Sequence, residues 1–581
     1  MTMIKNFCII IAAVFLLAGC EKNVSAQDNS PVAICQNGKF VGYVESNGVF
    51  VFKGIPYAKA PVGKLRWKTP QEVEASDETF EAKKFKPAAI QSYDEGEISS
   101  HGEMSEDCLN LNVWTADMTY REGRPVMVWI HGGSYGWGGV MDPLYDGKYL
   151  PGTYRDVVLV TIAYRVNALG FIDFKNVPGG EDFPDTPYLG ILDQIQALKW
   201  IQKNIKAFGG DPGNVTIFGE SAGGGSVSSL LVARNRDTHE SLTKGLFRRA
   251  IAMSGSIGLE RSQEEYDSDA IDMTTKFLAA TGCSTMDQLM ALSEKEILDA
   301  LNSDIGVVSI EGISSRVGDF CNYPLRDNIY SILPLDGFEA LRDGASADVD
   351  LMVGTVADEL RYHAHLQFNP EDREEGPLGN YYEWIQARME KAKSILTVTG
   401  CPEGADAIDE CFEGLDCIYD LIDKEWDGLY PDIWNYTEIS NEYTFRMPAI
   451  TMAQNHTEAG GKSYMYYFAK GLDADAEPGQ NFLKACHACE VTYAFNNSVT
   501  AEWGHHDPDL TLKFSNAFVN FARTGNPSIP GAVCPQYDAK NRSTLYMDRD
   551  GNVSVVNNPL GRQTELLLPT YKQYFLNRHI D

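Results

Sequence analysis

The chain has 581 residues, of which 44% are hydrophobic and 22% are charged, a composition typical of a soluble globular protein. Its 81 acidic and 49 basic residues give a formal net charge of −32, which repels phosphate backbones and argues against a nucleic-acid-binding function. This acidity favours solubility, and steering of cationic substrates is the alternative interpretation.

The N-terminus has the features of an export signal. A single lysine precedes an apolar run from Phe7 to Leu17, which is too short to cross a bilayer with flanks. The run ends in LAGC, which resembles a bacterial lipoprotein signal whose cysteine, here Cys20, becomes lipidated. We expect a signal peptide over residues 1–19, a flexible tether over residues 20–32, and a periplasmic or cell-envelope lipoprotein. A soluble secreted protein is the alternative. No later segment is apolar for long enough to cross a membrane, so lipid is the only membrane attachment expected.

Residues 33–581 are expected to form one domain in which apolar strands alternate with helices, the pattern of a mostly parallel sheet flanked by helices on both faces. In chain order, the expected strands and one long helix occupy residues 126–130, 157–164, 191–208 (the helix), 350–356 and 463–469. Helical and irregular stretches such as 267–303 and 371–427 are expected to be insertions that form a lid or gorge over the sheet.

A G-x-S-x-G motif lies between an expected strand, VTIF, and an expected helix, GGSVSSLLVA. This strand–turn–helix context is the one that a nucleophile elbow requires, with Ser221 projecting above the sheet. Side chains at Gly219 or Gly223 would collide with neighbouring elements. The helix that follows points backbone N–H groups at developing negative charge. Ser221 is therefore a candidate nucleophile.

The chain resembles the type-B carboxylesterases, the group that includes the cholinesterases. FGGDPGNVTIFGESAGGGS is similar to the serine-centred signature of that family, and SEDCLNLN (residues 105–112) is similar to its second signature. WIHGGSYGWG, AYRVNALGF and NFARTGNP also match, in the family's order. The resemblance covers nearly everything from about residue 38 onward. It implies an α/β-hydrolase fold and a serine-dependent hydrolase of carboxylic esters.

The resemblance also implies the partners of the serine, which needs a base to accept its proton and an acid to orient that base. GTVADELRYH is similar to the family's acid motif and places Glu359 in the acid's position. KACHACEVTYAF is similar to the histidine motif and places His487 as the base. Spacing alone leaves His487 as one of several candidates among ten histidines; His505 and His506 lie in a polar loop, where solvation is the simpler role.

The same resemblance implies an oxyanion hole formed by the N–H groups of Gly133, Ser134 and Ala222. Ser134 replaces the usual third glycine of the H-G-G-G run, so its side chain crowds the site and poor activity on esters of bulky tertiary alcohols is expected. Glu220 matches a family carboxylate near the catalytic histidine. Electrostatic support of the imidazolium and a buried structural role are equally compatible with it.

Several departures from the family limit the substrate. Cholinesterases carry a tryptophan ten positions before the signature cysteine, and Ile98 in its place argues against choline esters. The usual partner of Cys108 is missing, and Cys35 is a possible substitute in an oxidising compartment. Cys486 and Cys489 flank the base; a metal cluster lacks a fourth ligand, so a local disulfide or two small buried side chains are favoured. Disulfides are also expected among three cysteines of a loop-like insertion, Cys401, Cys411 and Cys417.

The sequence as a whole predicts hydrolysis of small to medium uncharged esters through an acyl-enzyme, with no metal or organic cofactor. Two rivals remain open at this point. A catalytically silent binding or adhesion protein on the same fold is disfavoured by the presence of the serine, acid and histidine together. Amide or peptide hydrolysis is possible as a side activity, since it uses the same residues. The sequence does not predict the oligomeric state.

Overall fold

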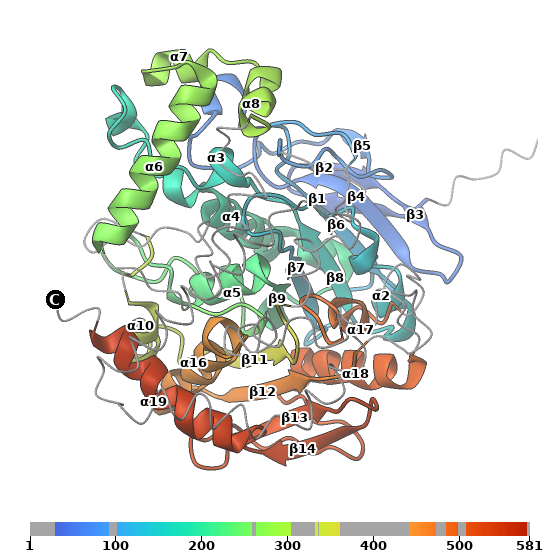
Figure 1. Ribbon diagram of the computed structural model, residues 1–581. Helices are drawn as coiled ribbons and strands as arrows, with labels where there is room; N and C mark the ends of the chain where they lie inside the picture. Colours follow the sequence, from blue (N-terminus) through green and yellow to red (C-terminus); the bar gives the residue numbers. More distant parts are fainter. Residues whose placement is uncertain are drawn as a thin grey trace, which may run out of the picture.

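The computed structural model describes the greater part of the chain. It covers residues 30–91, 102–257, 263–303, 332–334, 336–360, 441–471, 484–497 and 507–577. Among these residues, eleven strands form one large sheet and three form a small one. Figure 1 shows the large sheet crossing the molecule from β3 to the hairpin β13–β14.

The large sheet is parallel in its centre and antiparallel at its edges. The parallel strands run in the order β8-β7-β9-β10-β11-β12-β13, and β6, β4, β3 and β14 are added antiparallel. Its strands are β3 (Tyr43–Val44), β4 (Phe50–Pro56), β6 (Asn110–Thr115), β7 (Val126–Ile130), β8 (Val158–Ile162), β9 (Val215–Glu220), β10 (Arg249–Met253), β11 (Asp350–Val356), β12 (Ser463–Phe468), β13 (Ser543–Met547) and β14 (Val553–Asn557). The small sheet pairs β1 (Val32–Cys35), β2 (Gly38–Val41) and β5 (Thr79–Glu81).

Helices cover both faces of the large sheet (Figure 1). They are α2 (Tyr149–Thr153), α3 (Asn167–Gly170), α4 (Leu189–Asn204), α5 (Ala222–Val232), α6 (Gln263–Thr281), α7 (Met286–Met290), α8 (Glu294–Leu301), α10 (Gly337–Arg342), α16 (Met447–Glu458), α17 (Val491–Ala494), α18 (Pro508–Thr524) and α19 (Gly561–Asn577). A π-helical turn, Glu442–Arg446, precedes α16.

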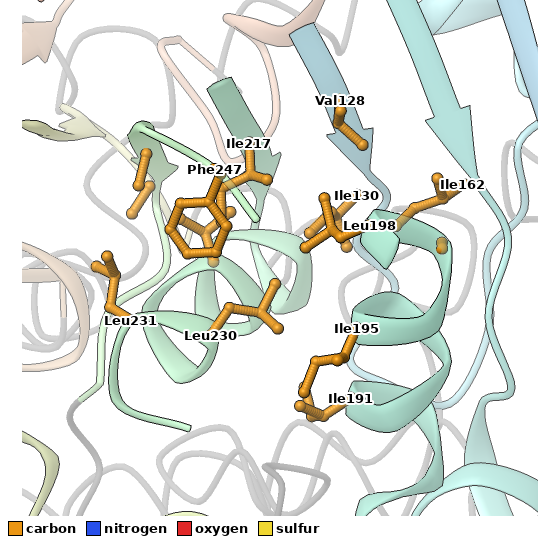
Figure 2. Packing of buried hydrophobic residues seen from close by; sticks show 14 of the residues in the cluster. Val128, Ile130, Ile162, Ile191, Ile195, Leu198, Ile217, Leu230, Leu231 and Phe247 are labelled. Carbon is orange, nitrogen blue, oxygen red and sulfur yellow. The ribbon is translucent and has the colours of Figure 1, made fainter. Parts of the chain in front are cut away.

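The core divides into two parts because successive residues of a strand point to opposite faces of the sheet. In β7, Val128 and Ile130 belong to one buried cluster, whereas Met127 and Trp129 belong to another. Figure 2 shows the first cluster, in which strand residues face α4 and α5. The second cluster includes side chains of α17 and α18. Both faces of the strand are therefore dry, which explains why its sequence is hydrophobic without alternation.

The elements predicted from the sequence are present within a few residues of their expected bounds. β7 and β11 match the expected strands at 126–130 and 350–356, and α4 with the short helix Ile205–Phe208 forms the helix expected at 191–208. The α/β-hydrolase architecture with a mostly parallel sheet is confirmed.

The insertion expected at 267–303 is helical. It contains most of α6 and all of α7 and α8, which Figure 1 shows grouped at the end of the molecule away from β13–β14. The other expected insertion, 371–427, lies outside the described residues. The single-domain boundary at 33–581 stays a prediction.

The cysteine pair expected from the sequence is not formed. Cys35 and Cys108 are both free thiols, and both are buried in the same apolar cluster. Each thiol packs there as a small apolar side chain, and burial raises the pKa of Cys35 to about 12, which opposes thiolate chemistry. All six cysteines in the described part of the chain are free. Cys401, Cys411 and Cys417 lie outside it.

Parallel pairing brings the carboxyl ends of the central strands to one edge of the sheet. Ile130 of β7 pairs with Gly219 of β9, and Met253 of β10 pairs with both Glu220 of β9 and Gly354 of β11. The loops that leave these strands therefore start side by side. Ligands of open parallel sheets bind at this edge, and the candidate site lies there.

Candidate active site

Ser221 occupies the sharp turn between β9 and α5. Its backbone has φ 59° and ψ −126°, a conformation that side-chain-bearing residues rarely adopt. The turn is held by hydrogen bonds at both peptide groups of the serine: its N–H donates to Met253 O at 3.0 Å, and its carbonyl accepts from Gly225 N at 2.8 Å. The strained turn presents a partly exposed serine at the carboxyl edge of the sheet.

The glycines around the serine are required by close packing. A Cβ atom on Gly219 would lie 2.6 Å from the carbonyl oxygens of Gly223 and Ile130. A Cβ atom on Gly223 would lie 2.9 Å from the carbonyl oxygen of His131. Real Cβ atoms do not approach backbone so closely, so only glycine lets α5 start against the end of β7.

His487 and Glu359 are brought into contact from opposite sides of a long stretch of sequence. Glu359 follows β11, and His487 lies in a turn before α17. His487 Nδ1 lies 2.6 Å from Glu359 Oε2, and the backbone N–H of His487 donates to Glu359 O at 3.1 Å. Val356 N–H donates to the second carboxylate oxygen, Oε1, at 3.0 Å. Because the acid is held at both oxygens, it fixes the orientation of the imidazole ring.

The other ring nitrogen of His487 faces the end of β9. His487 Nε2 lies 3.1 Å from Glu220 Oε1, and Glu220 directly precedes Ser221 in the chain. His487 and Glu220 are both about 95% buried, with 5% of their surface exposed. The histidine therefore lies between two carboxylates, Glu359 on one nitrogen and Glu220 on the other.

A third buried acid, Glu490, belongs to the same cluster. Its Oε1 accepts hydrogen bonds from Tyr466 at 3.2 Å and from Ser254 at 3.4 Å. Burial, with the Glu359 charge adding to it, raises the pKa of Glu490 to about 8. Sequence reasoning did not single out Glu490, Ser254 or Tyr466. Glu490 lies within the histidine motif, three residues after the base, but nothing in that spacing shows that it turns inward.

Burial sets the protonation of the cluster. It raises the pKa of Glu359 to about 8, although hydrogen bonds from Ser254 and Val356 oppose the rise. It also holds the pKa of Glu220 well above the usual range, with Glu490 and Glu359 contributing repulsion. The pKa of His487 is lowered by burial to about 3. Because charge is disfavoured on every member, the imidazole is neutral at neutral pH and able to accept a proton.

The turn after β7 supplies backbone donors next to the serine. A Cβ atom on Gly132 would lie 3.1 Å from Ser221 Cβ, which places this turn against the nucleophile elbow. Gly133 and Ser134 have φ 102° and φ 51°. The N–H groups of Gly133, Ser134 and Ala222 donate to no acceptor within the described residues. Three free N–H groups can bind an oxyanion, and Ser134 provides one of them despite its side chain.

The remaining residues named from the sequence either flank the base loop or lie outside the described residues. Cys486 and Cys489 are buried free thiols on either side of the base. Of the two arrangements favoured from the sequence, two small buried side chains are therefore observed and a local disulfide is not. In the described part of the chain no group of three or more histidine, cysteine, aspartate or glutamate side chains could hold a metal ion. Cys20, Ile98, His505 and His506 lie outside the described residues.

Comparison with known proteins gives matches along almost the whole chain. The model of the carboxylesterase family matches residues 29–565. The para-nitrobenzyl esterase of Bacillus subtilis is 31% identical over 562 residues, covering 93% of this chain and 99% of that protein. Carboxylesterase 1E of Mus musculus is 30% identical, covering 92% of this chain and 93% of that protein.

Solved structures give the same result. A PNB esterase aligns with a TM-score of 0.72 at 29% identity, covering 93% of this chain and 99% of that one. The carboxylesterase of Geobacillus stearothermophilus aligns with a TM-score of 0.68 at 30% identity, covering 92% and 99%.

The protonation of His487 predicts the acid limb of the pH profile. In a histidine that acts as a general base the neutral imidazole is the active form; burial lowers the pKa of His487, so its proton-accepting form persists to lower pH than in an exposed histidine. The kcat/KM for p-nitrophenyl acetate, measured between about pH 4 and 9, should therefore fall with a midpoint below 6.5, the ordinary value. Circular dichroism at each pH controls for unfolding, and a midpoint above 6.5 would contradict the expectation.

Proposed function

Because the chain belongs to the carboxylesterase family and is a carboxylic ester hydrolase, we propose that Ser221 is its nucleophile, His487 its general base and Glu359 the acid that orients the base. This assignment is supported above all by the 2.6 Å contact between His487 Nδ1 and Glu359 Oε2. It is supported further by the strained turn at Ser221 and by the free N–H groups around it.

Acylation is the first step of the proposed reaction. His487 Nε2 accepts the hydroxyl proton of Ser221 as Oγ bonds to the ester carbonyl carbon. Charge develops on the carbonyl oxygen, where the N–H groups of Gly133, Ser134 and Ala222 stabilise it. The imidazolium is stabilised through Nδ1–H by Glu359. The carbon–oxygen bond to the alcohol then breaks, and the alcohol takes the proton from His487, which leaves an acyl ester on the serine.

Deacylation repeats these steps with water. His487 accepts a proton from water as its oxygen bonds to the acyl carbon, and the same three N–H groups hold the oxyanion. The bond to Ser221 breaks, the serine regains its proton from His487, and the carboxylic acid is released. Glu220, 3.1 Å from Nε2, is placed to stabilise the imidazolium during both steps.

The substrates that we propose are small to medium uncharged carboxylic esters. The two relatives are named a para-nitrobenzyl esterase and a carboxylesterase, so aryl and alkyl esters without charge are the natural test substrates. Burial around the base disfavours charge on every acid of the cluster, so an anionic acyl group close to Ser221 would carry the same desolvation cost.

Replacing Ser221 by alanine tests the function directly. Hydrolysis of a p-nitrophenyl acyl series should fall by roughly four orders of magnitude or more, because the alanine variant has no nucleophile to form the acyl-enzyme. Ser226→Ala is a matched control: this serine is fully buried five residues further along the same helix, where it accepts a hydrogen bond from Gln194. Turnover by Ser221→Ala at the rate of the control would overturn the assignment and favour a different nucleophile.

Ser134 predicts which alcohol groups are hydrolysed slowly. Its side chain lies in the turn that faces the elbow, so an ester of a tertiary alcohol meets more crowding there than a primary one. We expect tert-butyl acetate to be hydrolysed at least about tenfold more slowly than n-butyl acetate, and Ser134→Gly to reduce that ratio. Gas chromatography of the released alcohols measures both rates. Equal rates on the two esters in the unmodified protein would contradict the role of Ser134.

We further propose that the protein is an exported lipoprotein held at a membrane through Cys20. The LAGC sequence supports this proposal, as does the polar stretch that follows it. Among the helices of the described residues, none is both long and apolar enough to cross a membrane. The disulfides that we propose for this compartment involve the cysteines at 401, 411 and 417.

The lipid anchor has its own test. In a bacterial host, the full chain should be recovered with the membrane fraction and should incorporate a labelled fatty acid, whereas Cys20→Ser should do neither. Cys283→Ser, at a partly exposed thiol in the folded region, is the control and should behave as the parent. Labelling that persists in Cys20→Ser would contradict lipidation at this residue.

A further inference from the structure

Three hydrogen bonds join the loops that carry the acid and the base. Two of them link backbone groups, and the third links a backbone N–H to the Asp358 carboxylate. Asp358 N–H donates to Ala485 O at 2.9 Å, and Ala485 N–H donates to the Asp358 carboxylate at 3.0 Å. One residue after Asp358 and two residues after Ala485, His487 N–H donates to Glu359 O. Asp358 directly precedes the acid, so its position and that of the acid are set together.

The Asp358 carboxylate has a second partner from a distant part of the chain. Its side chain is 2% exposed, and both of its oxygens meet the guanidinium group of Arg549, with Nη2 3.1 Å from Oδ1 and Nη1 bonded to Oδ2. Such a two-point contact fixes the plane of a carboxylate as well as its position. The Arg549 side chain is 46% exposed, so it reaches the buried acid from the surface.

Arg549 is presented by a rigid turn between β13 and β14. Asp548 accepts hydrogen bonds from the N–H groups of Asp550 at 3.0 Å and Asn552 at 2.8 Å, and Gly551 turns with φ 84°. A turn closed in this way holds its residues without help from the rest of the protein. The arginine is thus part of a preformed support.

The strands next to this turn carry the support to the acid loop. Ala469 N–H, after β12, donates to Met547 O at the end of β13. Ala357 N–H, after β11, donates to Phe468 O at the end of β12. The carboxyl ends of β13, β12 and β11 are therefore linked by one hydrogen bond each, and the last of these bonds is made by Ala357, the residue before Asp358.

We propose that Asp358 and Arg549 are positioning residues that hold Glu359 and His487 in register, and we call the two residues the Asp358–Arg549 clamp. The proposal rests on the proposed assignment of Glu359 as the acid and His487 as the base. Neither clamp residue touches the substrate in this scheme. Without Arg549 the buried Asp358 carboxylate loses its two-point contact with the guanidinium group, and the loop that carries Glu359 loses that restraint.

The clamp also shapes the electrostatics of the base. Burial is the main cause of the raised pKa of Glu359, and the Asp358 charge adds to it; the positive charge of Arg549 lies against Asp358. Glu220 at the end of β9, Glu490 before α17 and the Cys486 and Cys489 thiols of the base loop also face this region. Removing Arg549 makes the net charge near Glu359 and His487 one unit more negative, whereas removing the Asp358 charge makes it one unit less negative. The two changes should therefore shift the proton affinities of Glu359 and His487 in opposite directions.

The test compares Arg549→Gln, Arg549→Lys and Asp358→Asn in hydrolysis of p-nitrophenyl acetate. Arg549→Gln should lower kcat roughly tenfold with KM changed less than about twofold, because misplacement of the base affects the reaction more than binding. Arg549→Lys keeps the charge and should recover most of the loss. The acid limb of the pH profile should move up in Arg549→Gln and down in Asp358→Asn, by about half a pH unit.

The matched control is Arg523→Gln. Arg523 of α18 makes the same kind of two-point contact to Asp156, at 2.8 and 2.5 Å, but neither residue touches the acid or base loop. Arg523→Gln should leave kcat and the pH profile as in the parent. Thermal unfolding of each variant shows whether it is folded. Arg549→Gln should remain folded, because the side chain that it replaces is half-exposed.

The outcomes separate the clamp from the catalytic assignment. If Arg549→Gln and Asp358→Asn match Arg523→Gln in kcat and in pH profile, the clamp is wrong. Glu359→Gln, measured in parallel, tests the assignment beneath it. An impaired Glu359→Gln beside an unimpaired Arg549→Gln overturns the clamp alone, and an unimpaired Glu359→Gln overturns both. The double variant of Asp358 and Arg549 should lose no more than the worse single variant, since one interaction is removed in each case.

Discussion

A buried histidine held between two carboxylates is the interaction on which the rest of this structure depends. His487 meets Glu359 at one nitrogen and Glu220 at the other, in a region from which water is largely excluded. Burying a charge is costly unless it is paired and hydrogen-bonded. The surroundings meet this cost with donors: Val356 N–H on Glu359, and the Tyr466 and Ser254 hydroxyls on Glu490. The buried acids around the base are therefore held by a network of hydrogen bonds from other residues.

The sheet explains why these groups meet. Four adjacent parallel strands end at the same edge, and residues of the candidate site follow their ends: Gly133 and Ser134 after β7, Ser221 after β9, Ser254 after β10 and Glu359 after β11. Dry packing on both faces fixes the height of every strand relative to its neighbours. Loops that start from fixed points need few residues to converge. The rigid strands thus position the loops that carry the residues of the candidate site.

Sequence could predict the parts of the site that depend on local pattern. A strand buried on both faces is continuously hydrophobic, so β7 and β11 were predictable to the residue, and the elbow at Ser221 follows from glycines that are needed within one turn. Contacts between distant segments leave no such pattern. Asp358 and Arg549 are 191 residues apart, and Cys35, a possible partner of Cys108 from the sequence, is a free thiol, as is Cys108. Family resemblance can place Glu359 and His487, but only the fold shows what supports them.

Three serines with positive φ lie at this same edge of the sheet. Ser134, Ser221 and Ser254 have φ of 51°, 59° and 44°, and each follows the end of a central strand. Such a conformation costs on the order of 1–3 kcal/mol in a residue with a side chain and persists only when neighbouring bonds hold it. Ser221 N–H is held by the carbonyl of Met253, and Ser254 N–H by that of Gly354, so each strained turn is tied to the next strand across the sheet. The turns at Ser221 and Ser254 are therefore each held by the neighbouring strand, which restricts their backbones relative to one another.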